Sequence, residues 1–191
     1  MPKRTSPWLI IDIALKAVLV GLLLYAVLVP NSPQFEGKAM AGRAATYPLA
    51  ALIVPVLWWL RWHTRPYPVA VDILIVLPFL IDTVGNALDL YDSVSWWDDA
   101  NHFVNWALLT SGALLALQGV ALAAWNRFAL GSGFGAITAI LWELIEFVMF
   151  IKDSPERATA YTDTLGDLAL GLAGATLASL VISWWGHKQR S

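Results

Sequence analysis

WLIIDIALKAVLVGLLLYAVLV, residues 8–29, is a long apolar run in which Asp12 and Lys16 are the only charged side chains. About 20 consecutive apolar residues are enough to cross the hydrocarbon layer of a bilayer. The first small-x-small sequence after it, AMA at 39–41, lies too far away for a signal-peptide cleavage site. The run therefore predicts a retained membrane-spanning helix, in which Lys16 lies one turn from Asp12 and can pair with it.

Five more apolar runs follow, separated by short connectors that carry Pro, Gly, Asn and charge. The chain is 58% hydrophobic and only 14% charged, far from an ordinary soluble domain. It contains no cysteine, which excludes disulfides and thiolate metal sites. We therefore expect an all-α polytopic membrane protein, with residues 1–191 forming a single six-helix transmembrane bundle. The expected spans are 8–29, 44–62, 69–90, 99–124, 129–151 and 161–185.

The distribution of Lys and Arg predicts the orientation of this bundle. With six spans both termini face the same side, and cytoplasmic loops carry the excess of basic residues. Seven basic residues fall on the terminal side and four on the opposite side, so we expect both termini in the cytoplasm. The seven are Lys3, Arg4, Arg61, Arg65, Arg127, Lys188 and Arg190, and the four are Lys38, Arg43, Lys152 and Arg157. These basic residues are expected to contact lipid phosphates, and they form no nucleic-acid patch.

Acidic and amide side chains gather near the outer ends of the last four expected spans. The spacing within each span places most of these side chains on one helical face. Four helices then present polar groups at the same depth, which predicts one outward-facing acidic chamber. In chain order the groups are Asp82, Asn86 and Asp89; Asp98, Asp99, His102 and Asn105; Glu143 and Glu146; and Asp163 and Asp167.

Small residues on two of these helices support inward-facing polar faces. Gly131 and Gly135 are spaced for close helix approach, and Gly174 and Ala178 continue the stripe of Asp163 and Asp167. Trp96 and Trp97, directly before the polar residues of the fourth span, are expected to be interface anchors.

The chamber holds eight carboxyl groups, and the nearest bases in the sequence are Lys152 and Arg157. Like charges this close cannot all remain ionised in a low dielectric. Either several carboxyl groups are protonated or a cation lies among them. Carboxylates, an amide oxygen and an imidazole suit Ca²⁺, Mg²⁺ or Mn²⁺, and less exclusively Zn²⁺.

Simpler explanations remain open for several of these residues. Asp89, Asp98 and Asp99 can be solvated span ends, Asp98, Asp99 or Asp163 can cap a helix, and His102 can be a hydrogen-bonded structural histidine. Glu143, Glu146, Asp167 and Asp82 lie deeper in their spans, where ionisable groups usually serve a function. A ferritin-like di-iron site needs Glu-x-x-His pairs, which are missing here, as are GxSxG and HExxH.

The segments YDSVSWWDDANHF, ELIEF and DTLGDLALGLAGA resemble the YjdF-like family of bacterial inner-membrane proteins and, more distantly, VanZ-like proteins. The resemblance implies a helical fold in the bacterial inner membrane and a site made of the motif residues. It implies no activity. Glu146 and Asp167 depart from the VanZ-like pattern, which has Gln and Asn there, whereas Arg157 matches its arginine. The implied site residues are Asp99, His102, Glu143, Glu146, Asp163 and Asp167, and the pattern adds Asp82, Asn86, Asp98 and Asn105.

Three functions fit this pattern. A metal-dependent enzyme acting on a lipid or envelope precursor would use His102 or Glu143 as general base. A proton- or cation-coupled transporter would use the carboxylates as a relay, continued toward the cytoplasm by Asp12, Lys16 and Asp72. An assembly protein would use them only to hold the bundle together. The inner halves of the last three spans are almost wholly apolar, which favours a site open on one side.

Overall fold

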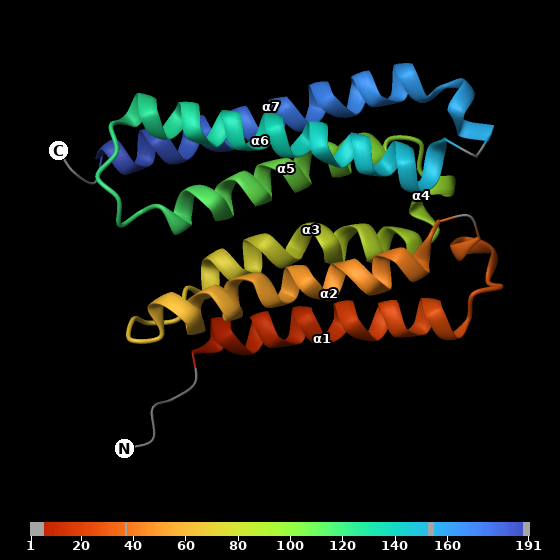
Figure 1. Cartoon of the computed structure of the whole chain (residues 1–191), viewed down its shortest axis with the longest axis horizontal. Helices are drawn as coiled ribbons and strands as arrows, with labels where there is room; N and C mark the ends of the chain where they lie inside the picture. Colours follow the sequence, from red (N-terminus) through yellow and green to blue (C-terminus); the bar gives the residue numbers. More distant parts are fainter. Residues whose placement is uncertain (1–5, 37, 153–154, 189–191) are drawn as a thin grey trace. The chain divides into compact units, whose positions relative to one another are not determined.

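A computed structural model describes residues 6–36, 38–152 and 155–188, and all regular secondary structure in these residues is helical. The chain forms two compact units, Met1–Leu90 and Tyr91–Ser191 (Figure 1). Three of the basic residues that predict the orientation, Lys3, Arg4 and Arg190, lie outside the described residues. The side chain of a fourth, Lys188, also lies outside them.

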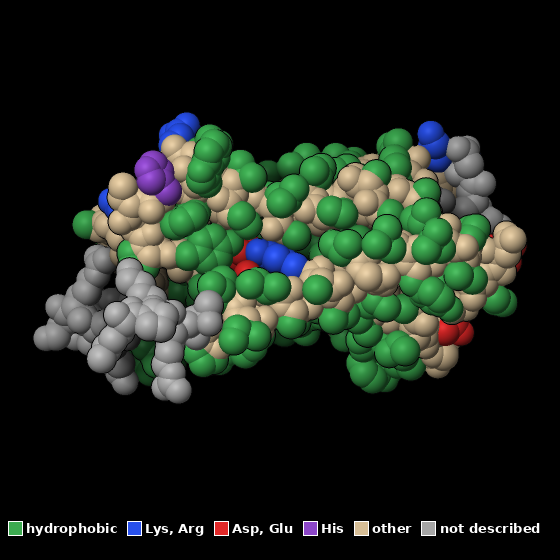
Figure 2. Space-filling model, turned by 90° about the horizontal axis from the view of Figure 1, so that it is seen from below, with side chains coloured by type: hydrophobic (Ala, Val, Ile, Leu, Met, Phe, Trp, Pro, Cys, Tyr) green, Lys and Arg blue, Asp and Glu red, His purple; other side chains and the backbone are tan. Residues whose placement is uncertain are grey.

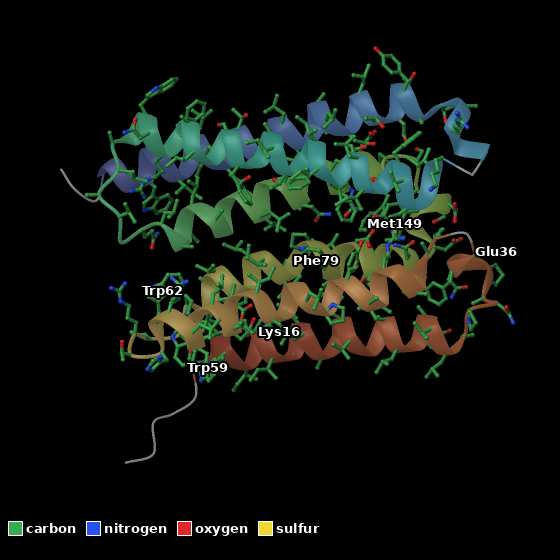
Figure 3. All side chains as sticks on the ribbon, in the orientation of Figure 1. Lys16, Glu36, Trp59, Trp62, Phe79 and Met149 are labelled. Carbon is green, nitrogen blue, oxygen red and sulfur yellow. The ribbon has the colours of Figure 1, made fainter. Side chains whose placement is uncertain are left out.

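Unit 1 consists of three long helices packed side by side: α1 (Pro7–Leu28), α2 (Met40–Leu57) and α3 (Val69–Ala87). The short helical turn η1 (Pro33–Phe35) lies between α1 and α2, and the π-helical turn η2 (Trp58–Trp62) continues α2. Leu19 and Leu23 of α1, Val54 of α2 and Val76 of α3 form part of its buried core. Trp59 and Trp62 mark one end of the unit and Glu36 the other (Figure 3).

Unit 2 contains α5 (Trp97–Ala116), α6 (Ala124–Glu146) and α7 (Ala160–Lys188), and α7 packs along both other helices. The short helix α4 (Leu90–Ser93) precedes them, and η3 (Phe147–Ile151) and η4 (Pro155–Ala158) connect α6 to α7. Trp106, Ala139 and Ala175, one residue from each long helix, are buried together at the centre. η3 is a π-helical turn, a feature often found near functional sites, and it begins directly after Glu146.

Five of the described helices are long and apolar enough to cross a membrane: Pro7–Leu28, Met40–Trp62, Val69–Ala87, Ala124–Met149 and Ala160–Trp185. The expected span 99–124 is the exception. It becomes α5, which has 20 residues and ends at Ala116. At 1.5 Å per residue its length, about 30 Å, matches the hydrocarbon thickness. Its first turns, however, carry Asp98, Asp99, Asn101 and His102, which lowers its apolar character.

The predicted close approach of helices through small residues is confirmed in unit 2. A Cβ added at Gly131 would collide with the Ser179 and Leu114 side chains, and one at Gly135 would collide with Ala175. At Gly174 the obstacle is backbone, the Phe103 carbonyl of α5, which cannot rotate away as a side chain can. These glycines therefore set the spacing of the three long helices.

The prediction that Asp82, Asn86 and Asp89 share one helical face is wrong for Asp89. Helix α3 ends at Ala87, and Asp89 has φ of 58°, so the chain leaves the helix before reaching it. Aspartate tolerates this left-handed conformation better than most residues. Asp89 therefore lies in the connector, with its side chain 51% exposed.

Candidate metal centre

His102 lies at the centre of a cluster of acids that α5, α6 and α7 bring together. Its Nδ1 is 3.6 Å from Glu143 Oε1 of α6, and its Nε2 is 3.6 Å from Asp167 Oδ1 of α7. Nε2 is also 3.7 Å from Oδ1 of Asp98, one turn earlier on α5. Each of the three long helices of unit 2 thus places one carboxylate beside the His102 imidazole.

Three side chains of this cluster are buried, so their charged forms are unfavourable in free energy unless an opposite charge or hydrogen bonds compensate them. His102, Glu143 and Asp167 are 8%, 6% and 5% exposed, whereas the Asp98 side chain is 46% exposed. Among the described residues, the ion pairs of Glu143 and Asp167 are made with His102 alone. Asp98, Glu146 and Asp163 add further negative charge around Asp167. A buried charge needs compensation by an opposite charge or by hydrogen bonds.

The distances between His102 and its three carboxylates are too long for good hydrogen bonds. A good N–H···O bond spans about 2.7 to 3.2 Å. Two ligands held about 2.1 Å from one tetrahedral ion lie about 3.4 Å apart. The 3.6 to 3.7 Å separations at His102 are closer to the second value than to the first.

Two groups of potential ligand atoms, each within 4.8 Å, share His102. One group is Asp98, His102 and Asp167, and the other is His102, Glu143 and Glu146. The nitrogens point to different sides of the ring, so one ion can contact only one of them. When one nitrogen ligates a metal, the other commonly donates to a carboxylate that fixes the ring orientation.

Two of the acids implied by the family resemblance lie apart from these groups. Asp99 and Asp163 are exposed, and both lie in the first turns of their helices. The capping alternative is wrong for Asp98, Asp99 and Asp163, because α5 has Trp96 as its N-cap residue and α7 begins at Ala160. Asn105 is half-buried, and its amide lies 3.4 Å from Asn101 Oδ1.

Asp82 of α3 has a base of its own within unit 1. Arg43 Nε donates to Asp82 Oδ2 at 2.9 Å, and the Tyr47 hydroxyl donates to the same oxygen at 2.7 Å. The buried Asp82 carboxylate is therefore well satisfied, and Asn86 donates in addition to the main-chain carbonyl of Asp82 at 2.9 Å. The expected span 44–62 leaves Arg43 in the preceding connector, but α2 begins at Met40 and buries Arg43.

A second buried charge cluster in unit 1 joins α1 to α3. Lys16 Nζ donates to Asp12 Oδ2 at 3.1 Å, which confirms the predicted pair, and also to Asp72 Oδ2. The Tyr67 hydroxyl donates to Asp72 Oδ2 as well. Both carboxylates are buried. The sequence spacing revealed only the pair within α1, because Asp72 reaches Lys16 through the packing of α3 against α1.

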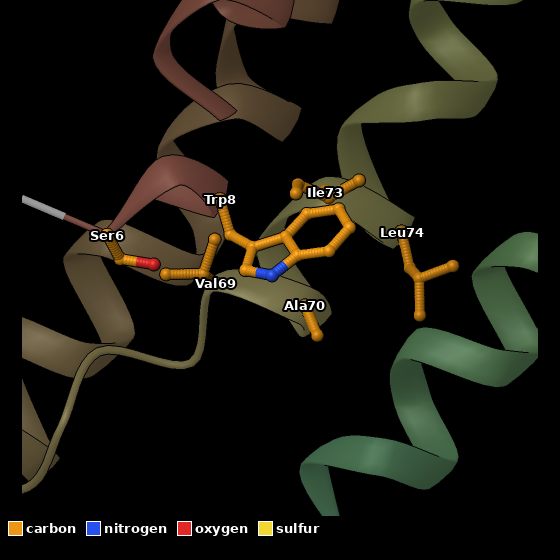
Figure 4. Close-up of a pocket in the computed structure, with 6 residues that line it drawn as sticks. All are labelled: Ser6, Trp8, Val69, Ala70, Ile73 and Leu74. Atoms are coloured by element: carbon orange, nitrogen blue, oxygen red, sulfur yellow. The ribbon is translucent and has the colours of Figure 1, made fainter. Parts of the chain in front are cut away.

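An apolar cavity of about 430 Å³ lies beside the first turns of α1 and α3 (Figure 4). It is lined by Ser6, Trp8, Val69, Ala70, Ile73 and Leu74. The Ser6 hydroxyl and the Trp8 indole N–H are the polar groups of this lining, so it suits apolar groups better than ions. All of these lining residues belong to unit 1.

The helices and their buried charges define the chain as an all-helical membrane protein with several spans. It belongs to the family described as "Predicted membrane protein (DUF2238)", whose model matches residues 11–188. This is the YjdF-like family that the sequence motifs resemble, and the VanZ-like resemblance has no support in the comparison. No curated protein and no solved structure matches the chain.

Proposed function

We propose that the protein is a multi-pass membrane protein and that unit 2 contains a site for a divalent cation around His102. The observation that carries the proposal is the position of His102, with carboxylate oxygens from three helices 3.6 to 3.7 Å from its ring nitrogens. An ion would bring the buried Glu143 and Asp167 carboxylates close to charge balance. A ligand set of imidazole and carboxylates suits Mn²⁺ or Zn²⁺, and suits Ca²⁺ or Mg²⁺ less because these ions prefer oxygen alone.

The ion would use one ring nitrogen of His102, and the carboxylate at the other nitrogen would orient the ring. On the Nε2 side the ligands are Asp98 and Asp167, with Glu143 as the orienting group. On the Nδ1 side the ligands are Glu143 and Glu146, with Asp167 as the orienting group. The Nε2 side is the more open of the two, because the Asp98 side chain is 46% exposed.

An open coordination position favours a metal-dependent enzyme over a purely structural ion. A bound ion that keeps a water ligand lowers the pKa of that water and supplies a nucleophile near neutral pH. Glu143, beside His102, is then placed to accept a proton as general base. A lipid or an envelope precursor is the substrate class that reaches such a site from the bilayer. Transport of protons or cations is the alternative, favoured by the buried Asp12–Lys16–Asp72 cluster of unit 1.

The orientation supports a site near the outer face of a bacterial cytoplasmic membrane. We propose that α5 crosses as a sixth span, with both termini cytoplasmic. Arg43 and Arg127 are buried within α2 and α6, so neither counts as a loop residue. The number of Lys and Arg residues is then six on the terminal side of the membrane and three on the opposite side. Reporter fusions at Ser95 and Gly119, on either side of α5, should report outside and inside. The same side for both would contradict a spanning α5.

The direct test is the metal content of purified protein after equilibration with Mn²⁺ or Zn²⁺. Glu143→Gln and Asp167→Asn each remove a ligand or an orienting group, and loss of such a group typically lowers metal affinity about 10- to 100-fold or more. Comparing the metal content of Asp98→Asn with that of Glu146→Gln shows which ring nitrogen of His102 binds the ion. Asp98→Asn removes a ligand only if the ion is at Nε2, and Glu146→Gln only if it is at Nδ1.

Asp89→Asn is the matched control, since it removes an exposed carboxylate in unit 1. It should leave metal content unchanged. Equal metal content in wild type, Glu143→Gln and Asp167→Asn would reject the cation site.

A further inference from the structure

The Asp12–Lys16–Asp72 cluster carries an inference independent of the metal site. Asp12 of α1 is 2% exposed and Asp72 of α3 is 0% exposed. Lys16 lies on α1 (Figure 3), and its ammonium holds the Oδ2 atoms of both carboxylates. The molecular face in Figure 2 is mostly hydrophobic, with a basic side chain beside an acidic one near its middle.

The charges of this cluster do not cancel when every group is ionised. Two carboxylates and one ammonium give −2 + 1 = −1 in a buried site. Asp12 Oδ1 and Asp72 Oδ1 are both buried and have no hydrogen-bond partner among the described residues. A carboxylate oxygen buried without a donor is costly. One added proton would remove the net charge and supply the missing donor.

Among the residues of unit 1 that the structure describes, the neighbouring groups supply no second base. Tyr67 precedes α3, and burial together with its hydrogen bond to Asp72 raises its pKa, so it stays a neutral donor. From α2, Arg43 and Tyr47 contact Asp82, ten residues farther along α3 and so about 15 Å away. The other basic side chains near this end of α2, Arg61, His63 and Arg65, are exposed.

We propose that Asp12 and Asp72 form a proton-binding site that holds one proton between the two carboxyl groups. Both carboxyl groups contact the same Lys16 ammonium through their Oδ2 atoms, which places the two groups next to each other. Lys16 neutralises the remaining negative charge, and Tyr67 keeps one acceptor of Asp72 occupied. Buried carboxyl groups in membrane helices commonly mark proton pathways. The site uses residues of unit 1 alone and does not depend on a metal.

Infrared spectroscopy of the purified protein at neutral pH tests the proposal, because a protonated carboxyl has a C=O stretch distinct from that of a carboxylate. The wild type minus Asp12→Asn difference spectrum should show one carboxylic-acid band that shifts in D₂O. Asp12→Asn leaves Lys16 and Asp72 as a balanced pair, so the variant should fold and lose the proton. Asp89→Asn, an exposed acid of the same unit, should retain the band.

Tyr67→Phe provides a second readout that removes no charge. It deletes the donor to Asp72 Oδ2, so the band should change frequency and keep its intensity. Spectra in sodium and in an organic-cation buffer should coincide. A band unaltered by both Asp12→Asn and Tyr67→Phe would overturn the proposal, as would a band that sodium removes, since the site would then bind a metal cation.

Discussion

The two units bury acidic side chains in opposite electrostatic settings. In unit 1 each buried acid contacts a base from the same unit: Asp82 contacts Arg43, and Asp12 and Asp72 contact Lys16. In unit 2 the base that the buried Glu143 and Asp167 share is one imidazole, which is charged only when protonated. A buried ion pair supplies its own counter-charge, whereas a carboxylate cluster around histidine needs a proton or an ion.

This difference separates structural acids from candidate functional ones. The Arg43–Asp82–Tyr47 group is satisfied at 2.9 and 2.7 Å, distances of good hydrogen bonds, and therefore needs no ligand. The His102 group has separations of 3.6 to 3.7 Å, which leave room for a shared ion. The Asp12–Lys16–Asp72 group lies between the two cases, with a base present but one negative charge in excess.

The largest effect is expected from removing the internal base of unit 1. Arg43→Met would leave Asp82 buried without its guanidinium partner, which typically costs about 3 to 5 kcal/mol. The double variant Arg43→Met with Asp82→Asn should recover most of that loss. Unfolding by denaturant in detergent micelles measures both. Lys38→Met is the matched control, because Lys38 is 3.8 Å from an exposed Asp89, and such pairs contribute at most about 1 kcal/mol.

If Arg43→Met is no more destabilising than Lys38→Met, the internal pairing of unit 1 is not what stabilises Asp82. The claim that bases of unit 1 stabilise its buried acids would then be wrong for Asp82.

In unit 2 the removal of a carboxylate should have the opposite sign. Without divalent ions, Glu143→Gln relieves repulsion and should leave stability equal or higher. With an ion at 100 times its Kd, the wild type should gain about 2.7 kcal/mol, and Glu143→Gln should gain much less. Thermal unfolding with chelator and with added Mn²⁺ measures both. A destabilised Glu143→Gln in chelator would make unit 2 resemble unit 1, with an internal partner such as the Thr164 hydroxyl stabilising the Glu143 carboxylate.

The close packing of α7 against α5 should matter less, because it positions the site without contacting the ion. Gly174→Ala places a methyl group against the Phe103 carbonyl, next in sequence to His102, at a cost of about 1 to 3 kcal/mol. Gly166→Ala on the same helix has open space around its Cβ and should gain about 0.5 to 1 kcal/mol. Unfolding midpoints of the two variants should therefore move in opposite directions. Equal shifts would show that α7 can move away from α5 without cost.

The sequence predicted the helical membrane fold, because long apolar runs have no other low-energy environment. It also named His102, Glu143 and Asp167, the three buried residues that the structure brings together in the candidate site. The sequence did not predict ion pairs whose two residues lie on different helices and meet only through helix packing. The Arg43–Asp82 and Lys16–Asp72 pairs join residues far apart in sequence, so spacing carries no sign of them. Helix ends caused the remaining errors, because Asp89 lies just past α3 and Arg43 just inside α2.

The smallest effect is expected at Asp99, where family motif and geometry disagree. The motif resemblance assigns Asp99 to the site, but Asp98 lies one turn before His102 and faces it at 3.7 Å, whereas Asp99 is exposed. Adjacent helical residues point about 100° apart, so both cannot face the same ligand. Asp99→Asn should change stability by no more than about 0.5 kcal/mol and leave Mn²⁺ content unchanged. Asp98→Asn should lower Mn²⁺ content if the ion is on the Nε2 side of His102. Loss of metal in Asp99→Asn with full retention in Asp98→Asn would mean that α5 is rotated, and the distances around His102 would no longer support the site.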